Sequence, residues 1–110
     1  MANLEAITGR YVNLDIDGLS YRIYFEEAGE GPPLICMHTA GADGRQWRHL
    51  LNDEEITSRF RVSAFDLPFH GKSTPPGEWW LSQYKLTTKH YAEVIRQFWQ
   101  ALNLEKPILM

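Results

Sequence analysis

Cysteine is nearly absent from this sequence of 110 residues, in which Cys36 stands alone. A single cysteine cannot form a disulfide within the chain, and it cannot build a cysteine-based metal framework. It lies in the apolar run Leu34-Ile35-Cys36-Met37, where a free cysteine is most often a small buried hydrophobe. We therefore expect no cysteine nucleophile and no metal, and we expect a reduced, cytoplasmic protein.

An excess of positive charge is also lacking, since 11 Lys and Arg face 14 Asp and Glu, for a net charge of -3. Proteins that bind nucleic acid usually carry a basic patch, so no nucleic-acid partner is predicted. No window approaches the eighteen or so apolar residues that cross a bilayer, so no membrane partner is predicted either. The N-terminus has neither a basic flank nor an apolar stretch, so we expect no signal peptide.

What the sequence does contain is a period-two pattern over residues 10–26. Apolar and polar residues alternate on both sides of Asp17-Gly18, a pair that suits a tight turn because both positions need φ > 0. We therefore predict an antiparallel hairpin. Its alternating apolar positions are Val12, Leu14, Ile16, Leu19, Tyr21, Ile23 and Phe25.

The pattern changes in the middle of the chain. The apolar runs 34–37 and 61–65 do not alternate, as is typical of parallel strands that are covered on both faces. Between them, residues 45–51 begin a short amphipathic helix, and Ile56 and Phe60 extend its apolar side.

From Thr87 onward the period is 3.6, which predicts a helix over residues 88–102. Thr87 or Thr88 can cap its start, and Asn103 can take the left-handed conformation at its end. A final strand follows at 107–110. The apolar face of the helix is formed by Tyr91, Val94, Ile95, Phe98 and Leu102.

The predicted order is hairpin, strand, helix, strand, helix, strand. Strands that alternate with helices predict an α/β fold with a mostly parallel sheet and right-handed crossovers. In such sheets, ligands bind outside the carboxyl ends of the strands. Two polar segments follow the predicted strands directly, His38-Thr39-Ala40-Gly41 and the segment from Asp66 to Ser73.

These segments, in this order and spacing, resemble the α/β-hydrolase superfamily. Its members typically carry His-Gly after the third strand and Asp-x-x-Gly-x-Gly-x-Ser after the fourth. A helix then ends in a phrase like Leu-Asn-Leu-Glu-Lys-Pro, and a fifth strand leads into Gly-x-Ser-x-Gly. The resemblance covers essentially the whole chain and departs from the pattern at two positions, where Thr39 and Phe69 replace glycines.

The resemblance implies a single partial α/β-hydrolase domain over residues 1–110. Strand 34–37 is then expected between strands 61–65 and 107–110, with the hairpin beyond 61–65. The helices near 45–51 and 88–102 are expected on opposite faces of the sheet.

The family mechanism needs a nucleophile on a strained turn, a histidine base and an acid that orients it. The nucleophile motif is missing, because no serine lies between the required glycines; the serines are Ser20, Ser58, Ser63, Ser73 and Ser82. We therefore expect the chain to be truncated before that motif and inactive by itself. Whether the absent nucleophile is Ser, Cys or Asp stays open.

The resemblance does imply one half of an oxyanion hole, a backbone N–H just after the third strand. By position Ala40 is the best candidate for this donor, with Thr39 and Gly41 as its neighbours. A further set of residues is expected to shape the loops rather than to react: His38, Asp66, Gly71 and Ser73.

Trp79 and Trp80 could line a substrate entrance, although a loop packed against the sheet is the alternative. The implied activity is hydrolysis of an ester, a lactone or another carbonyl-linked bond. The implied partner is a small-molecule carbonyl substrate, bound only by the completed fold, and no cofactor is implied. Two rival interpretations are a non-catalytic interaction or dimerisation module, and one chain of a split two-chain hydrolase. In each case the edge of strand 107–110 is expected to self-associate or to pair with a partner chain.

Overall fold

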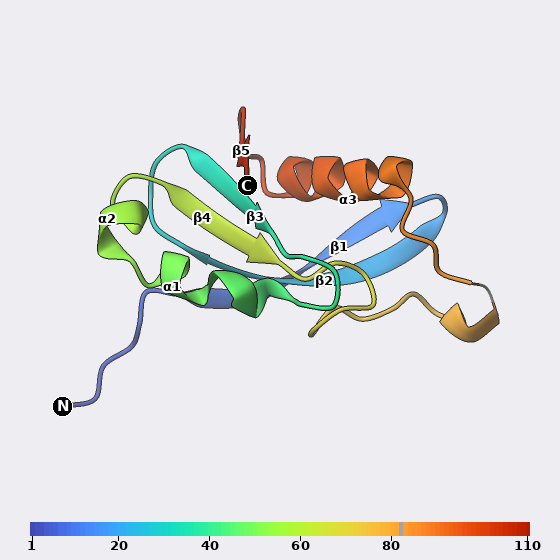
Figure 1. Cartoon of the computed structure of the whole chain (residues 1–110), viewed down its shortest axis with the longest axis horizontal. Helices are drawn as coiled ribbons and strands as arrows, with labels where there is room; N and C mark the ends of the chain where they lie inside the picture. Colours follow the sequence, from blue (N-terminus) through green and yellow to red (C-terminus); the bar gives the residue numbers. More distant parts are fainter. Residues whose placement is uncertain (82) are drawn as a thin grey trace.

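Five strands form one mixed sheet in the computed structural model, which describes residues 1–81 and 83–110 and thus leaves Ser82 outside (Figure 1). Their order across the sheet is β1-β2-β4-β3-β5. The strands are β1 (Thr8–Ile16), β2 (Leu19–Ala28), β3 (Pro33–Met37), β4 (Arg61–Phe65) and β5 (Ile108–Leu109). This α/β arrangement is the one that the sequence predicted.

The predicted hairpin is present and is longer than the pattern indicated. β1 pairs antiparallel with β2 from Thr8↔Glu27 to Ile16↔Leu19. Asp17 and Gly18 have φ of 51° and 78°, so both turn residues take the left-handed conformation that the Asp-Gly pair predicted.

The three later strands are parallel, and β3 lies between β4 and β5 as expected. β2 joins them through antiparallel pairing with β4, in the register Phe25↔Phe65. β5 is short, but the backbone of Met110 continues its ladder. The Met110 N–H donates to the Ile35 carbonyl at 2.9 Å, and the Met37 N–H donates to the Met110 carbonyl at 2.8 Å.

The predicted helix over 45–51 is present, with a 3-10 first part, but it does not continue to Ile56. A 3-10 turn, η1 (Gly44–Trp47), leads into α1 (Arg48–Leu51), and a separate turn of helix, α2 (Glu54–Thr57), follows. α2 is separate from α1 because Asp53 caps a new start, its carboxylate accepting the Glu55 N–H at 3.0 Å.

The longest helix is α3 (Thr88–Ala101), which begins and ends as predicted. The Thr87 hydroxyl accepts the His90 N–H at 3.1 Å, and Asn103 has φ of 55° just beyond the last turn. A short 3-10 turn, η2 (Trp79–Leu81), precedes this helix. No helix in residues 1–81 and 83–110 has the length and apolar character needed to cross a membrane.

The helices cover opposite faces of the sheet, as expected, with α3 on one side and α1 and α2 on the other (Figure 1). Alternate residues of the same strands belong to two separate apolar clusters. Ile35 and Phe65 pack with Phe98 of α3, and the Phe65 and Phe98 rings are stacked at 4.8 Å between centroids. The opposite cluster contains Ala28, Leu34, Cys36, Leu51, Val62 and Ala64.

Candidate functional site

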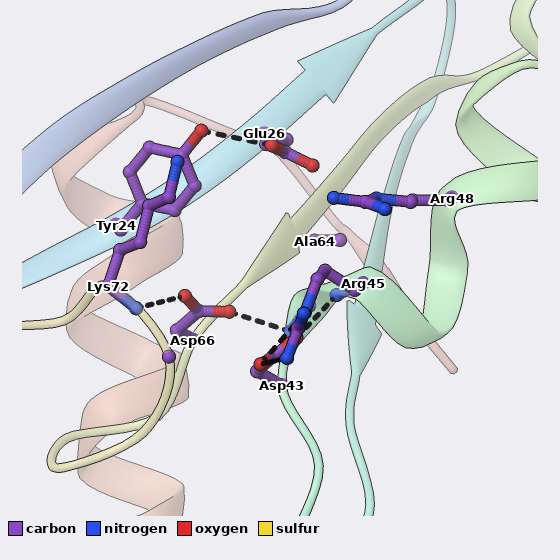
Figure 2. Close-up of a pocket in the computed structure, with 10 residues that line it drawn as sticks. Tyr24, Glu26, Asp43, Arg45, Arg48, Ala64, Asp66 and Lys72 are labelled. Atoms are coloured by element: carbon purple, nitrogen blue, oxygen red, sulfur yellow. Dashed lines mark hydrogen bonds and ion pairs between the residues drawn. The ribbon is translucent and has the colours of Figure 1, made fainter.

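Two loops meet at the carboxyl ends of β3 and β4, and the carboxylate of Asp66 joins them (Figure 2). Its Oδ1 accepts the Gly44 N–H at 2.6 Å, and its Oδ2 accepts the Lys72 N–H at 2.8 Å. Asp66 is only 5% exposed, and hydrogen bonds to a charged group of this kind are stronger than neutral ones. One buried side chain thus fixes the segments 38–44 and 66–73 relative to each other.

Ser73 and Gly71 close the second of these loops. The Ser73 hydroxyl donates to the Asp66 carbonyl at 2.7 Å and accepts the Tyr24 N–H at 3.0 Å, which attaches the loop to β2. Gly71 has φ of 52°, and a Cβ at this position would overlap Asp66 Oδ2. The close approach and the left-handed backbone both require glycine here.

His38 is buried at the start of the first loop, and both of its ring nitrogens make contacts. The Leu67 N–H can only donate, so His38 Nε2, at 3.0 Å, is the acceptor and the ring proton lies on Nδ1. Nδ1 then donates to the Thr39 carbonyl at 3.0 Å. His70 lies beside it, with ring centroids 5.1 Å apart. His38 therefore links the two loops through both nitrogens in this arrangement.

The segment predicted to carry the oxyanion donor forms a tight turn from Thr39 to Ala42. The Ala42 N–H donates to the Thr39 carbonyl at 3.1 Å, and Gly41 has φ of 76°, as the third residue of a type II turn requires. Ala40 and Gly41 are exposed. Within residues 1–81 and 83–110, neither of their N–H groups has a hydrogen-bond partner.

The three predicted donors are therefore not equivalent. The Thr39 N–H donates to Oε1 of Gln46 at 2.9 Å, and the Thr39 hydroxyl reaches the same oxygen at 3.2 Å. Sequence reasoning missed Gln46, because nothing in the local pattern separates it from other polar residues of a short helix.

Phe69 takes the left-handed conformation, φ 68°, at a position where the family pattern has glycine. Its ring packs on Tyr84, with centroids 4.2 Å apart, and on the edge of Trp79 at 6.1 Å. Trp79 and Phe69 both line a hollow of about 220 Å³, which Trp80 does not line. Both tryptophans are exposed, so neither packs into the core.

A second cavity of about 330 Å³ lies between β2, η1 and the 66–73 loop (Figure 2). The Arg45 side chain lowers the pKa of Asp43 to about 2 through their hydrogen bonds. Burial, followed by the bond to Glu26, raises the pKa of Tyr24 to about 12. Charged and phenolic groups here thus pair with one another. Other lining residues are Gly44, Arg48, Ala64, Asp66, Gly71 and Lys72.

The one cysteine of the chain is buried in β3 and is not an activated nucleophile. Burial raises the pKa of the Cys36 thiol to about 11, so this cysteine is protonated at neutral pH and is a poor nucleophile. In the described part of the chain, no three His, Cys, Asp or Glu side chains gather to hold a metal ion. What the arrangement offers is a pair of exposed backbone donors, which can stabilise a negatively charged oxygen.

A comparison with models of protein families matches residues 32–110 to the family described as alpha/beta hydrolase fold. The chain therefore belongs to the alpha/beta hydrolase fold family. Curated relatives share more than 30% identity with parts of the chain, and two of them follow. A pimeloyl-[acyl-carrier protein] methyl ester esterase of Methylococcus capsulatus is 36% identical over 57 residues, which are 52% of this chain and 22% of the relative. A 2-hydroxy-6-oxononadienedioate/2-hydroxy-6-oxononatrienedioate hydrolase of Klebsiella pneumoniae is 32% identical over 72 residues. These are 63% of this chain and 25% of the relative.

Solved structures give the same fold. An N-acyl homoserine lactonase complexed with N-butanoyl homoserine superposes with a TM-score of 0.71 at 31% identity, over 91% of this chain and 35% of that one. A haloalkane dehalogenase from Agrobacterium tumefaciens superposes with a TM-score of 0.67 at 23% identity, over 92% of this chain and 31% of that one. At this identity the likeness shows the fold alone. The chain thus spans about a third of the solved structures and a quarter or less of the curated relatives.

Proposed function

We propose that this chain forms the N-terminal part of a hydrolase that cleaves an ester, a lactone or a related carbonyl-linked bond. The observation that carries the proposal is the turn from Thr39 to Ala42, which leaves the Ala40 and Gly41 N–H groups exposed beside the carboxyl end of β3. Relatives above 30% identity support the bond type, since their names include a methyl ester esterase and an N-acyl homoserine lactonase.

In this proposal the chain supplies an oxyanion donor and no reacting side chain. Attack on a carbonyl places negative charge on its oxygen, and a backbone N–H aimed at that oxygen contributes roughly 3–4 kcal/mol to transition-state stabilisation. Ala40 is the proposed donor. The nucleophile, the acid and the catalytic histidine would come from polypeptide that these 110 residues do not contain, so the chain by itself would be inactive.

The exposed edge of β5 favours a second role, as an interaction surface. Ile108 and Leu109 are 48% and 45% exposed, and β5 pairs on one side only, with β3, among the residues that the structure describes. An apolar edge with unpaired backbone groups recruits other strands. We propose that this edge takes a further strand, from continuing polypeptide, from a partner chain or from a second copy. A cytoplasmic location stays a prediction from the sequence.

The coding sequence immediately downstream of residue 110 separates these possibilities. Gly-x-Ser-x-Gly in frame would place the nucleophile on the same polypeptide, and the same motif in a separate frame would indicate a split or broken gene. Its absence from both would favour the interaction module.

The test of the proposed donor is Ala40→Pro in the chain extended by, or mixed with, the downstream polypeptide. Proline removes the N–H, and type II turns favour proline at this second position, so the turn itself is expected to survive. We expect kcat for p-nitrophenyl acetate to fall by about 10²- to 10³-fold, with little change in KM. The matched control is Ala42→Ser, a small change at the end of the same turn. An active extended enzyme that tolerates Ala40→Pro without loss would contradict the proposal.

A further inference from the structure

Gln46 contacts the candidate oxyanion turn from the adjacent η1. Its side-chain oxygen accepts two hydrogen bonds from a single residue, the Thr39 N–H at 2.9 Å and the Thr39 hydroxyl at 3.2 Å. A backbone N–H can only donate, so the Gln46 atom that faces it is the carbonyl oxygen of the amide and not its nitrogen. The direction of the amide is thus determined by the backbone.

The carbonyl of Thr39 is held as firmly as its N–H. It accepts the Ala42 N–H at 3.1 Å and the Nδ1 proton of His38 at 3.0 Å. The other nitrogen of His38 is fixed by the Leu67 N–H of the neighbouring loop. Both peptide groups of Thr39 therefore have a fixed orientation, which sets the direction of the turn that follows.

Gln46 is itself placed by the buried carboxylate of the site. Asp66 holds the Gly44 N–H at the start of η1, and the Gln46 N–H donates to the Asp43 carbonyl at 3.1 Å. The contact between Gln46 and Thr39 thus depends on the same frame that joins the two loops.

We propose that Gln46 is a positioning residue that removes the Thr39 N–H from the set of oxyanion donors and leaves those of Ala40, the proposed donor, and Gly41 to face the substrate oxygen. The inference rests on the proposed function, because an oxyanion donor matters only to a carbonyl-cleaving enzyme. It also accounts for Thr39, which replaces a glycine of the family pattern. A glycine at this position would keep the backbone bond to Gln46 but would lack the hydroxyl that makes the second one.

Amide hydrogen exchange of the ¹⁵N-labelled 110-residue chain tests the contact without any catalysis. We expect the Thr39 amide to exchange more slowly than the Ala40 amide, relative to their intrinsic rates. A net intramolecular hydrogen bond is worth about 1 kcal/mol, so Gln46→Ala is expected to accelerate Thr39 exchange by roughly fivefold to tenfold. The rate at Ala40 is expected to change by less than about twofold.

Two further variants separate positioning from a general structural effect. Gln46→Glu keeps an acceptor oxygen in the same place and is expected to preserve the slow exchange at Thr39. Thr39→Val removes only the hydroxyl and is expected to accelerate exchange by a smaller factor than Gln46→Ala. Gln100→Ala, at an exposed glutamine of α3, serves as the control and should leave both loop amides unchanged.

Slower amide exchange at Ala40 than at Thr39 in the native chain, relative to their intrinsic rates, would overturn the inference. An exchange rate of the Thr39 amide that is the same in Gln46→Ala and in the native chain would also overturn it. The same holds if the Thr39 amide exchanges as fast in Gln46→Glu as in Gln46→Ala. If Gln46→Ala unfolds the chain, the Thr39→Val comparison still decides. The two proposals can fail separately: an extended enzyme that tolerates Ala40→Pro would refute the proposed donor even where the exchange pattern holds.

Discussion

The loops at the carboxyl ends of β3 and β4 differ from the edge of β5 in how far their polar and apolar groups have partners within the described residues. In the loops, buried polar groups meet one another: Asp66 accepts two backbone N–H groups, and His38 uses both ring nitrogens. At β5, apolar side chains are about half exposed, and the strand has a neighbour on one side only among the described residues.

The contrast indicates that the candidate site and the sheet are completed by different means. The loops are fixed by hydrogen bonds between segments 22 and 6 residues apart in this same chain. The edge of β5 has no such bonds on its outer side among the described residues, and we propose that a further strand covers it. The donor half of the site is therefore expected to be preformed whether or not the edge is covered.

The largest expected effect comes from removing the group that joins the loops. Asp66→Ala leaves the Gly44 and Lys72 N–H groups without their acceptor in a buried site, which is expected to cost about 3 kcal/mol of the free energy of unfolding. Urea unfolding followed by tryptophan fluorescence measures it. Asp15→Ala, at an exposed position of β1, is the control and should stay within about 0.5 kcal/mol. A loss below about 1 kcal/mol at Asp66 would show that the loops are held in another way.

A smaller loss is expected from crowding the same carboxylate. Gly71→Ala places a methyl group against Asp66 Oδ2 at a position with φ of 52°, and we expect a loss of about 2 kcal/mol. Gly77→Ala is the matched control, because a Cβ there meets nothing within 4 Å. Equal stability of the two variants would contradict the close approach at Gly71.

Acid is expected to weaken the start of η1. The pKa of Asp43 is lowered to about 2 by its hydrogen bonds to Arg45, so its contribution is present above the ordinary carboxyl pKa near 3.8 and is lost as pH falls toward 2. Since Arg45 is largely exposed, solvent screens the pair and the contribution is expected to be small. The difference in Tm between the native chain and Asp43→Asn should therefore shrink between pH 4 and pH 2. A constant difference across that range would rule out the pair as its cause.

The smallest change in stability, and a large change in association, is expected at the β5 edge. Leu109→Lys places a charge on an exposed apolar edge, a device that natural edge strands use against pairing. We expect sedimentation equilibrium to show self-association weakened by at least about tenfold, with unfolding changed by less than about 1 kcal/mol. Leu4→Lys, at a fully exposed residue near the N-terminus, controls for the added charge. Identical association of both variants would locate the contact elsewhere.

Local patterns predicted most of the fold. The Asp17-Gly18 turn, the non-alternating strands and the start of α3 at Thr87 each depend on neighbours in sequence, and each is confirmed. The helix predicted over 45–51 is present as η1 and α1, but the expected extension toward Ile56 is a separate helix, because Asp53 caps a second start that the apolar spacing does not reveal. Hydrophobic periodicity reports which side is buried, and it says little about where a short helix stops.

The candidate site was less predictable for a related reason. The sequence could identify Thr39, Ala40 and Gly41 as a group, but it could not separate Thr39 from the other two, since the residue that distinguishes it is Gln46, seven positions away. Similarly, the left-handed backbone at Phe69 follows from the loop as a whole and not from the preference of phenylalanine. Contacts between loops require the sheet that brings them together.

We propose that this chain carries oxyanion donors and no attacking group, and ester hydrolysis by the purified 110-residue chain tests this most directly. The measurement is p-nitrophenyl acetate turnover at neutral pH against buffer alone, with an unfolded sample of the same chain as the control. We expect a rate equal to that of the control. A rate well above buffer that disappears on substitution of one residue, such as His38, His70 or Ser73, would contradict it.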